Sequence, residues 1–235
     1  MEAIVLAGGL GTRLRSAVPE LPKPMAPVAG RPFLEYLLDY WIGQGVTRFI
    51  LSVGYRQQAL REHFGGAYRA AGIAYAGEEQ PLGTGGGLRL ACGLLAGPGP
   101  FLVLNGDTYF EVPLEQLVRF HRAHRAEATL ALFRSPQHGR YGAVRLGEQG
   151  EILCLESAGG KAGGLANGGV YLMERGLPEG GPWHPGSALS LEDDILPHAL
   201  AGGRRICGMV CAGRFLDIGL PEDYARAARM LAGEP

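Results

Sequence analysis

The stretch "IVLAGGLGTRL", residues 4–14, sets the pattern from which the fold is inferred. A short apolar run, typical of a buried strand, leads into a glycine-rich turn, and Arg13 follows that turn. Three further apolar runs lie in the first half of the chain: "RFILSVG", "IAYAGE" and "FLVLNGD". Helical patterns separate them, as in "PFLEYLLDYWI", where Phe33, Leu37 and Trp41 recur at helical spacing. Alternating strands and helices predict a largely parallel sheet with helices on both faces.

The character of the sequence changes after Ala126. Strand-like runs joined by glycine-rich turns follow: "ATLALFRS", "YGAVRL", "EILCLE" and "LANGGVYLME". A helix at "SLEDDILPHALAGG", a strand at "RICGMVCAG" and a last helix from Pro221 complete the pattern. We therefore expect one α/β domain over residues 1–235, with a Rossmann-like mixed, mostly parallel sheet flanked by helices. Its two halves are residues 1–126 and 127–235.

Composition excludes several classes of protein. The net charge of −1 offers no basic surface for a nucleic-acid partner. The chain has no signal-like N-terminus and no apolar run of roughly 20 residues, so we expect a cytoplasmic protein with no membrane partner. The four cysteines have no histidines at zinc-ligand spacing, and we interpret them as core residues.

Lysine is rare in this chain. Of the 22 basic residues, 20 are arginine, and Lys23 and Lys161 are the only lysines. Arginine thus serves wherever a solvated cation suffices, so a retained lysine is a candidate for a role that needs a compact ammonium group. Lys23 is the stronger candidate because it lies in a motif-like segment, "LPKPMAP".

Ligands of open α/β sheets bind beyond the carboxyl ends of the strands, so polar residues there are expected to converge. The first turn matches neither a P-loop nor the dinucleotide fingerprint, since Leu14 stands where the last glycine of the fingerprint belongs. Its glycines still allow several amide groups to face one phosphate chain, and Arg13 adds a bidentate donor. Asp107 and Asp217 each end an apolar strand beside glycine, and they are either magnesium ligands near phosphates or ordinary turn aspartates.

Six motifs then occur in order along the chain: "LAGGLGTRL", "LPKPMAPVAGRPFLEYLL", "PLGTGGGL", "LNGDT", "NGGVYL" and "FLDIGLPEDY". Together they resemble the sugar-1-phosphate nucleotidylyltransferase family over essentially the whole chain. Within that family, "PKPMAPVAGRPFLEYLL" and "SLEDDILP" look most like guanylyltransferases that act on D-glycero-α-D-manno-heptose 1-phosphate. The hexapeptide-repeat domain of longer relatives is not expected, and neither is acyltransferase activity.

The resemblance implies a nucleotide-diphospho-sugar transferase fold, with residues 1–126 as the nucleotide-binding half and 127–235 as the sugar-phosphate half. It also implies Mg²⁺ as cofactor and two substrates, a nucleoside triphosphate and a sugar 1-phosphate, and it leaves a homo-oligomer open. A sugar phosphate oxygen would attack the α-phosphorus and pyrophosphate would leave. Enzymes of this kind work mainly by positioning and charge neutralisation.

The resemblance assigns a role to each matching residue. Arg13 would hold the β- and γ-phosphates, Lys23 would reach the reacting phosphates, and Asp107 and Asp217 would hold the metal. Nucleotide contacts are assigned to the turn residues Leu6, Ala7, Gly8, Gly9, Gly11, Thr12, Glu78, Gly83 and Thr84. Sugar-phosphate contacts are assigned to Gly142, Glu156, Lys161 and Asn167.

Two of these assignments go beyond the family pattern. Relatives usually carry Glu-Lys where this chain has Glu156 followed by Ser157, and we hypothesise that Lys161 supplies the missing cation. Glu78 stands where relatives specific for uracil or thymine often have glutamine. A carboxylate suits the two adjacent donors of guanine, which favours GTP, although a solvated glutamate is the alternative.

Other functions remain to be weighed. Mannose-1-phosphate guanylyltransferase and glucose-1-phosphate thymidylyltransferase are alternatives of the same class. A non-catalytic nucleotide- or sugar-sensing module would be expected to lose the arginine, the lysine or the aspartates, all of which are present. A glycosyltransferase typically holds its metal through Asp-x-Asp, whereas "NGDTYF" offers a single aspartate.

Overall fold

The computed structural model describes residues 1–9, 21–135, 140–156, 163–219 and 221–232. Four strands predicted in the first half form its parallel core, in the order β6 (Ala71–Gly77), β4 (Arg48–Val53), β1 (Glu2–Leu6) and β7 (Phe101–Asn105). The short strand β5 (Ala67–Tyr68) pairs with β6 at the edge. Each parallel crossover carries a helix, as parallel pairing requires.

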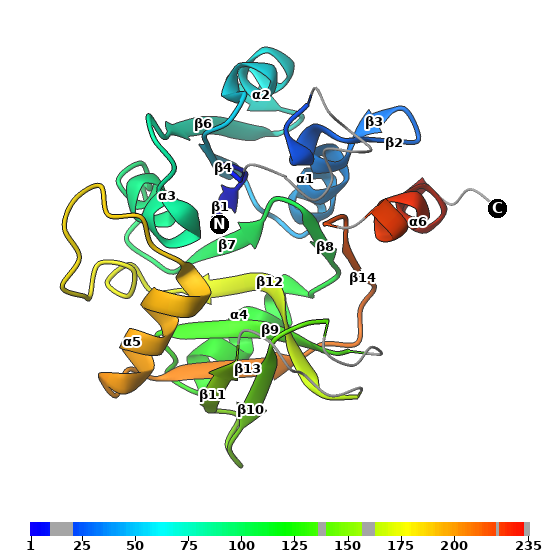
Figure 1. Cartoon of the computed structure of the whole chain (residues 1–235). Helices are drawn as coiled ribbons and strands as arrows, with labels where there is room; N and C mark the ends of the chain where they lie inside the picture. Colours follow the sequence, from blue (N-terminus) through cyan, green and yellow to red (C-terminus); the bar gives the residue numbers. More distant parts are fainter. Residues whose placement is uncertain (10–20, 136–139, 157–162, 220, 233–235) are drawn as a thin grey trace.

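The second half of the chain continues the same sheet. β12 (Leu165–Met173) lies antiparallel to β7 and also pairs with β9 (Ala128–Arg134), beside which β13 (Ile206–Val210) runs parallel. β10 (Ala143–Leu146) joins β12 to the outermost strand, β11 (Ile152–Glu156). The predicted mixed sheet is confirmed, and Figure 1 shows it running through the whole molecule.

Helices cover both faces because the strands alternate their side chains between two cores. In β1, Ala3 and Val5 belong to one core and Ile4 to the other. The first core is closed by α1 (Phe33–Gly43), α2 (Gln57–Phe64) and α4 (Leu114–Ala123). The second is closed by α3 (Gly83–Cys92), the π-helical turn η2 (Leu191–Ile195) and α5 (Leu196–Ala201). Within the described ranges no helix is long and apolar enough to cross a membrane.

Several very short elements escaped the sequence-based prediction. A single 3₁₀ turn, η1 (Lys23–Met25), is followed by the hairpin of β2 (Pro27–Val28) and β3 (Arg31–Pro32). β8 (Thr108–Phe110) also escaped it, and it pairs antiparallel with β14 (Phe215–Asp217), the apolar strand that was expected to end at Asp217. The last helix, α6 (Pro221–Ala232), packs with these pieces in a third small core around Phe33 and Leu216. Figure 1 shows β8, β14 and α6 together at one side of the sheet.

Candidate active site

The two predicted metal-binding aspartates are brought together by the pairing of β8 with β14. Asp107 lies in the turn that follows β7, and Asp217 is the last residue of β14, directly opposite Thr108. The backbone amide of Ile218 donates to the carbonyl oxygen of Asp107 at 3.0 Å, which fixes the two turns to one another. The Gly219 amide donates to Asp217 Oδ1 at 2.6 Å. Two carboxylates 110 positions apart in sequence therefore face one site.

Lys23 lies between these carboxylates. Its Nζ is 2.5 Å from Asp107 Oδ2 and 3.8 Å from Asp217 Oδ1, and its side chain is only 10% exposed. Burial, together with the charge of Asp107, raises the pKa of Asp217 above its ordinary value, while Lys23 opposes that shift. One ammonium leaves the ionised pair with a residual charge of −1. A site of this kind attracts a further cation.

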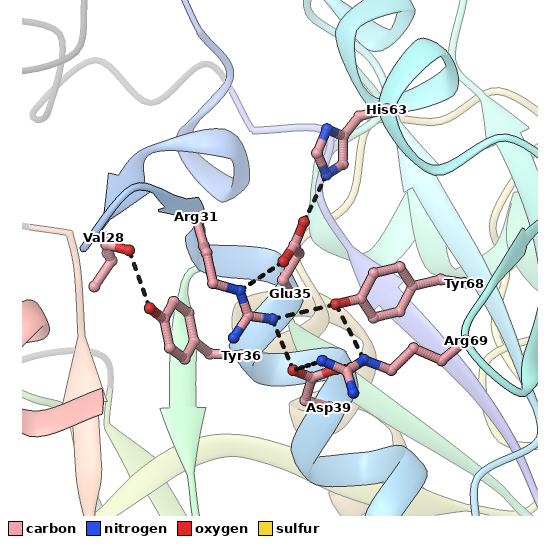
Figure 2. Close-up of polar contacts among 8 residues, drawn as sticks. All are labelled: Val28, Arg31, Glu35, Tyr36, Asp39, His63, Tyr68 and Arg69. Atoms are coloured by element: carbon pink, nitrogen blue, oxygen red, sulfur yellow. Dashed lines mark hydrogen bonds and ion pairs between the residues drawn. The ribbon is translucent and has the colours of Figure 1, made fainter. Parts of the chain in front are cut away.

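A polar cluster holds the hairpin of β2 and β3, which follows the turn that carries Lys23, against α1 (Figure 2). The Arg31 guanidinium, at the end of the β2–β3 hairpin, donates to Glu35 and Asp39 of α1, each at 2.8 Å. The Tyr36 hydroxyl, also on α1, donates to the carbonyl oxygen of Val28 at 3.1 Å. His63 bonds Glu35 from α2, and Arg69 bonds Asp39 from beyond β5. The hairpin that follows η1 is thereby anchored to α1, and α1 in turn is bonded by side chains of α2 and of the segment after β5.

The donor set fits a magnesium ion that also binds substrate phosphates. Among the described residues there is no group of three or more histidine, cysteine, aspartate or glutamate side chains that could enclose a metal alone. Mg²⁺ commonly takes one or two carboxylates and completes its shell with water and phosphate oxygens. Asp107 and Asp217 supply that number of carboxylates.

The described part of the predicted phosphate turn lies beside the same site. Leu6 ends β1, and the Ala7 amide donates to the carbonyl oxygen of Ser52 at 2.8 Å. Gly106, which precedes Asp107, donates to the Leu6 carbonyl oxygen at 2.9 Å, and a Cβ there would lie 2.7 Å from that oxygen. The turns after β1 and β7 are thus in direct contact, and Gly106 permits the contact. Three further predicted residues, Gly11, Thr12 and Arg13, lie outside the described residues.

Glu78 is not a freely solvated glutamate. Its half-buried carboxylate accepts hydrogen bonds from the Ser52 hydroxyl at 3.3 Å and from the Leu82 amide at 3.0 Å. A Cβ on Gly8 would lie 2.9 Å from Glu78 Oε1, and one on Gly87 would lie 2.5 Å from it. The two glycines leave room for this carboxylate between the first turn and α3.

The other predicted nucleotide contacts begin α3. Gly83 has a φ of +70°, and a Cβ there would lie 2.4 Å from the carbonyl oxygen of Leu189, so both conformation and space require glycine. The Thr84 hydroxyl accepts from the Leu191 amide at 2.8 Å and donates to Glu192 Oε2 at 3.1 Å. The start of α3 is therefore tied to η2.

The predicted sugar contacts lie on the second half of the sheet. Asn167, on β12, donates through Nδ2 to the Tyr171 hydroxyl at 2.7 Å and accepts from the Gly169 amide at 3.1 Å. Gly142 immediately precedes β10, and Glu156 ends β11 opposite Ala143. Lys161 lies outside the described residues.

The sequence did not reveal a cavity of about 460 Å³ that extends to Asp217. Its wall includes Arg140 and Arg226, both paired with Asp223, whose side chain is only 3% exposed. Two guanidinium groups against one carboxylate leave a positive charge beside the carboxylates of the site. Asp223 gave no distinguishing signal, because an acidic residue in the first turn of a helix is common.

Comparison with known proteins now identifies the family. Residues 2–234 match the model of the nucleotidyl transferase family. The chain belongs to this family. The expected resemblance is confirmed, and the protein is an enzyme of the nucleotidyltransferase type.

Named relatives of similar length include a D-glycero-α-D-manno-heptose 1-phosphate guanylyltransferase from Aneurinibacillus thermoaerophilus. That nucleotidyl transferase is 37% identical over 231 residues, covering 98% of each chain. A mannose-1-phosphate guanylyltransferase from Mycobacterium tuberculosis is also 37% identical, over 97% of this chain and 64% of the relative. The crystal structure of HddC from Yersinia pseudotuberculosis complexed with GMP-PN superposes with a TM-score of 0.83 at 30% identity. The superposition covers 97% of this chain and 98% of the HddC chain.

Proposed function

We propose that this nucleotidyltransferase moves a guanylyl group from GTP to a sugar 1-phosphate, with D-glycero-α-D-manno-heptose 1-phosphate as the favoured acceptor. The observation that carries the proposal is the convergence of Lys23, Asp107 and Asp217 at the end of the parallel strands. Full-length relatives named as guanylyltransferases for that heptose phosphate support the choice of substrates. Mannose 1-phosphate is the second candidate acceptor, supported by the mycobacterial relative.

In this reaction the protein mainly positions the two substrates and neutralises their charge. An oxygen of the sugar phosphate forms a bond to the α-phosphorus of GTP, and the bond from that phosphorus to the bridging oxygen breaks, releasing pyrophosphate. The acceptor brings its own anionic oxygen, so no protein nucleophile is required. Lys23 neutralises charge on the reacting phosphates, and a preorganised cation in a site that excludes water is effective at this task. A bound Mg²⁺, held by Asp107 and Asp217, would supply further neutralisation and draw phosphate oxygens together.

The two substrates would occupy opposite sides of this centre. On the nucleotide side, the turn after β1 and the start of α3 would hold the triphosphate, and Glu78 would accept from the guanine base. Its position against Gly8 supports that role. On the sugar side, Asn167, Glu156 and the backbone of Gly142 would face the hydroxyl groups, with Lys161 as the cation for the sugar phosphate.

A panel of substrates tests the proposal. Pyrophosphate release should be measured for four nucleoside triphosphates crossed with heptose, mannose and glucose 1-phosphates, with Mg²⁺ and with EDTA. The expected maximum is GTP with heptose 1-phosphate in the presence of Mg²⁺. A maximum with dTTP and glucose 1-phosphate would instead support the thymidylyltransferase alternative, and no release with any pair would overturn nucleotidyl transfer by this chain.

The two residue-level assignments need separate variants. Glu78→Gln should shift the preference for GTP over dTTP towards dTTP, and an unchanged preference would exclude Glu78 from base selection. Lys161→Ala should raise the KM for the sugar phosphate and leave the KM for GTP unchanged. An unchanged KM for the sugar phosphate would exclude Lys161 as the replacement for the lysine that relatives carry after the equivalent of Glu156.

A further inference from the structure

The Tyr171 hydroxyl is the centre of a buried hydrogen-bond network. Tyr171 lies on β12 with 0% of its surface exposed. Its hydroxyl donates to Glu192 Oε1 at 2.7 Å and accepts from Asn167 Nδ2 at 2.7 Å. These two bonds use the hydroxyl's one proton and one of its two acceptor positions.

The direction of each bond in this network is fixed by chemistry. The Gly169 amide can only donate, and it donates to Asn167 Oδ1, so the other end of that amide group is the NH₂ that faces Tyr171. A carboxylate can only accept, so Tyr171 must direct its proton to Glu192. The second oxygen of Glu192 accepts from Thr84, which in turn accepts from the Leu191 amide. None of these groups can reverse its bonds without leaving a partner unsatisfied.

The network joins both proposed substrate sides. Thr84 begins α3 on the nucleotide side, and Asn167 lies on β12 on the sugar side. Tyr171 and Glu192 connect them through two side chains that belong to neither set of assigned contacts.

Apolar packing alone does not explain why residue 171 is tyrosine rather than phenylalanine. Tyr171 is flanked by Val170 and Leu172, and phenylalanine would fill the same core volume without burying a polar group. Glu192 belongs to a π-helical turn, a local geometry that is often found at functional sites. Burial and the nearby Glu192 carboxylate raise the pKa of Tyr171 well above its ordinary value, so the hydroxyl keeps its proton. A buried hydrogen-bond network of this kind favours one arrangement of its members.

We propose that Tyr171 and Glu192 are positioning residues that couple the nucleotide and sugar subsites. Nucleotide bound against Thr84 holds Glu192, which orients Tyr171 and with it the Asn167 amide that faces the sugar. Sugar phosphate bound at Asn167 orients Tyr171, which holds Glu192 and through it Thr84. This inference rests on the proposed function, because it takes the two subsites from it.

The test measures coupling between the ligands rather than activity alone. The dissociation constant of heptose 1-phosphate is measured by calorimetry with and without a GTP analogue that has a methylene group between its α- and β-phosphorus. In the unmodified enzyme the analogue should tighten sugar-phosphate binding about 5-fold or more, as is typical of coupled sites. Linkage requires the same factor for the analogue when the sugar phosphate is added first.

In Tyr171→Phe that factor should fall to within about twofold of one, while the melting temperature shows that the variant is folded. Glu192→Gln, which loses one of its two acceptor oxygens, should also reduce the factor. Tyr75→Phe is the control, because among the described residues its hydroxyl bonds backbone carbonyl oxygens, those of Leu60 and Gly65, and it should retain the full coupling.

The possible results separate this inference from the proposed function. Coupling that persists in Tyr171→Phe, or an unmodified enzyme that turns over without any coupling, would overturn the positioning role and leave guanylyl transfer intact. Failure of the unmodified enzyme to release pyrophosphate would overturn the proposed function itself. Loss of coupling in Tyr75→Phe as well would show a general loosening, and it too would overturn the specific role of Tyr171.

Discussion

We expect the proposed chemistry to depend most directly on Lys23. Its ammonium is nearly buried between two carboxylates, and its neighbours Pro24 and Met25 are buried as well. The segment that carries Lys23 is therefore held in place. Lys23→Met should lower kcat by about 10²- to 10³-fold, the usual cost of removing one preorganised donor from a reacting group.

Lys23→Arg should restore little of that activity, since a planar guanidinium does not fill the place of a point charge between two carboxylates. The measurement is steady-state pyrophosphate release with saturating GTP and heptose 1-phosphate, with the melting temperature as a check of folding. A kcat for Lys23→Met within a few fold of the unmodified enzyme would exclude Lys23 from the reaction.

Gly106 allows a different prediction at the same scale. A Cβ at this position would lie 2.7 Å from the Leu6 carbonyl oxygen, a backbone atom that cannot move without disturbing β1. Gly106→Ala should therefore destabilise the fold by about 1–3 kcal/mol, the usual cost of overpacking. Gly43 is the control, because a Cβ there meets nothing within 4 Å and the residue ends α1. Gly43→Ala should stabilise by about 0.4–1 kcal/mol. Urea unfolding of both variants compares them, and equal shifts would contradict the contact between the two turns.

The sequence signals for individual residues differ for a physical reason. Asp107 could be predicted at the carboxyl end of a parallel strand, because it follows the apolar run of β7 beside glycine. Asp217 was expected to join it on the same rule, but it is brought there by the pairing of β14 with β8, outside the main sheet. Tyr171 could not be singled out, because "GGVYLM" has the pattern of any buried strand. Its acceptor Glu192 lies 21 positions away in the sequence, and only the folded structure brings it to the Tyr171 hydroxyl.

At the scale of elements, the pair β8–β14 places both aspartates, and Glu111 reinforces it. The Glu111 carboxylate accepts from Arg214 Nε at 2.9 Å, from Nη2 at 2.6 Å and from the Arg214 amide at 3.1 Å. Hydrogen bonds from Arg214 hold the pKa of Glu111 below its ordinary value. The ionised group therefore stabilises the fold above the ordinary carboxyl pKa of about 4.3, and that contribution is lost as the pH falls through the lowered value.

Glu111→Gln should accordingly reduce stability at pH 7 by about 1 kcal/mol or less, since Arg214 is largely exposed to solvent. For a chain of this size the melting temperature would fall by at most roughly 2–4 °C. Once the pH is below the lowered pKa of Glu111, the variant and the unmodified protein should melt together. Glu115→Gln serves as the control, since Glu115 and its partner Arg119 are both highly exposed and no measurable change is expected. A difference that is constant across pH would exclude the charge of Glu111 as its cause.

Helices and strands were predicted correctly where apolar residues recur at a regular spacing, and they were missed where the element is too short to show one. The long strands and helices carry a period of two or of 3.6 residues, and their order gave the sheet. β8 and β14 are only three residues each, too short for a period to be recognised, and they are defined by pairing with each other across the chain. The helix predicted at 190–203 begins with a π-helical turn, a detail that depends on the contacts of Ser190 and Thr84 rather than on periodicity.

At the scale of the whole molecule, the sheet separates two cores, and segments distant in sequence meet at the carboxyl ends of its parallel strands. Leu6 ends β1, and Glu78 and Asp107 follow the parallel strands β6 and β7. Asp217 and Asn167 come from the second half of the chain. A ligand that touches both groups links the halves, so it should stabilise the folded state as a whole.

Binding of GTP should consequently raise the melting temperature, and Mg²⁺ should be required for the full effect. At a free concentration of about 100 times the dissociation constant, a ligand specific for the native state adds about 2.7 kcal/mol, or roughly 5–10 °C for a chain of this size. With EDTA the shift should be smaller, because the phosphates would then face the uncompensated charge of Asp107 and Asp217. Asp217→Asn leaves the nucleotide turn in place but removes one proposed ligand, so its shift should be similar with and without Mg²⁺. Thermal scans of both proteins with GTP, in Mg²⁺ and in EDTA, make the comparison. Equal shifts of the unmodified protein in the two conditions would show that the two aspartates do not hold a metal with the nucleotide.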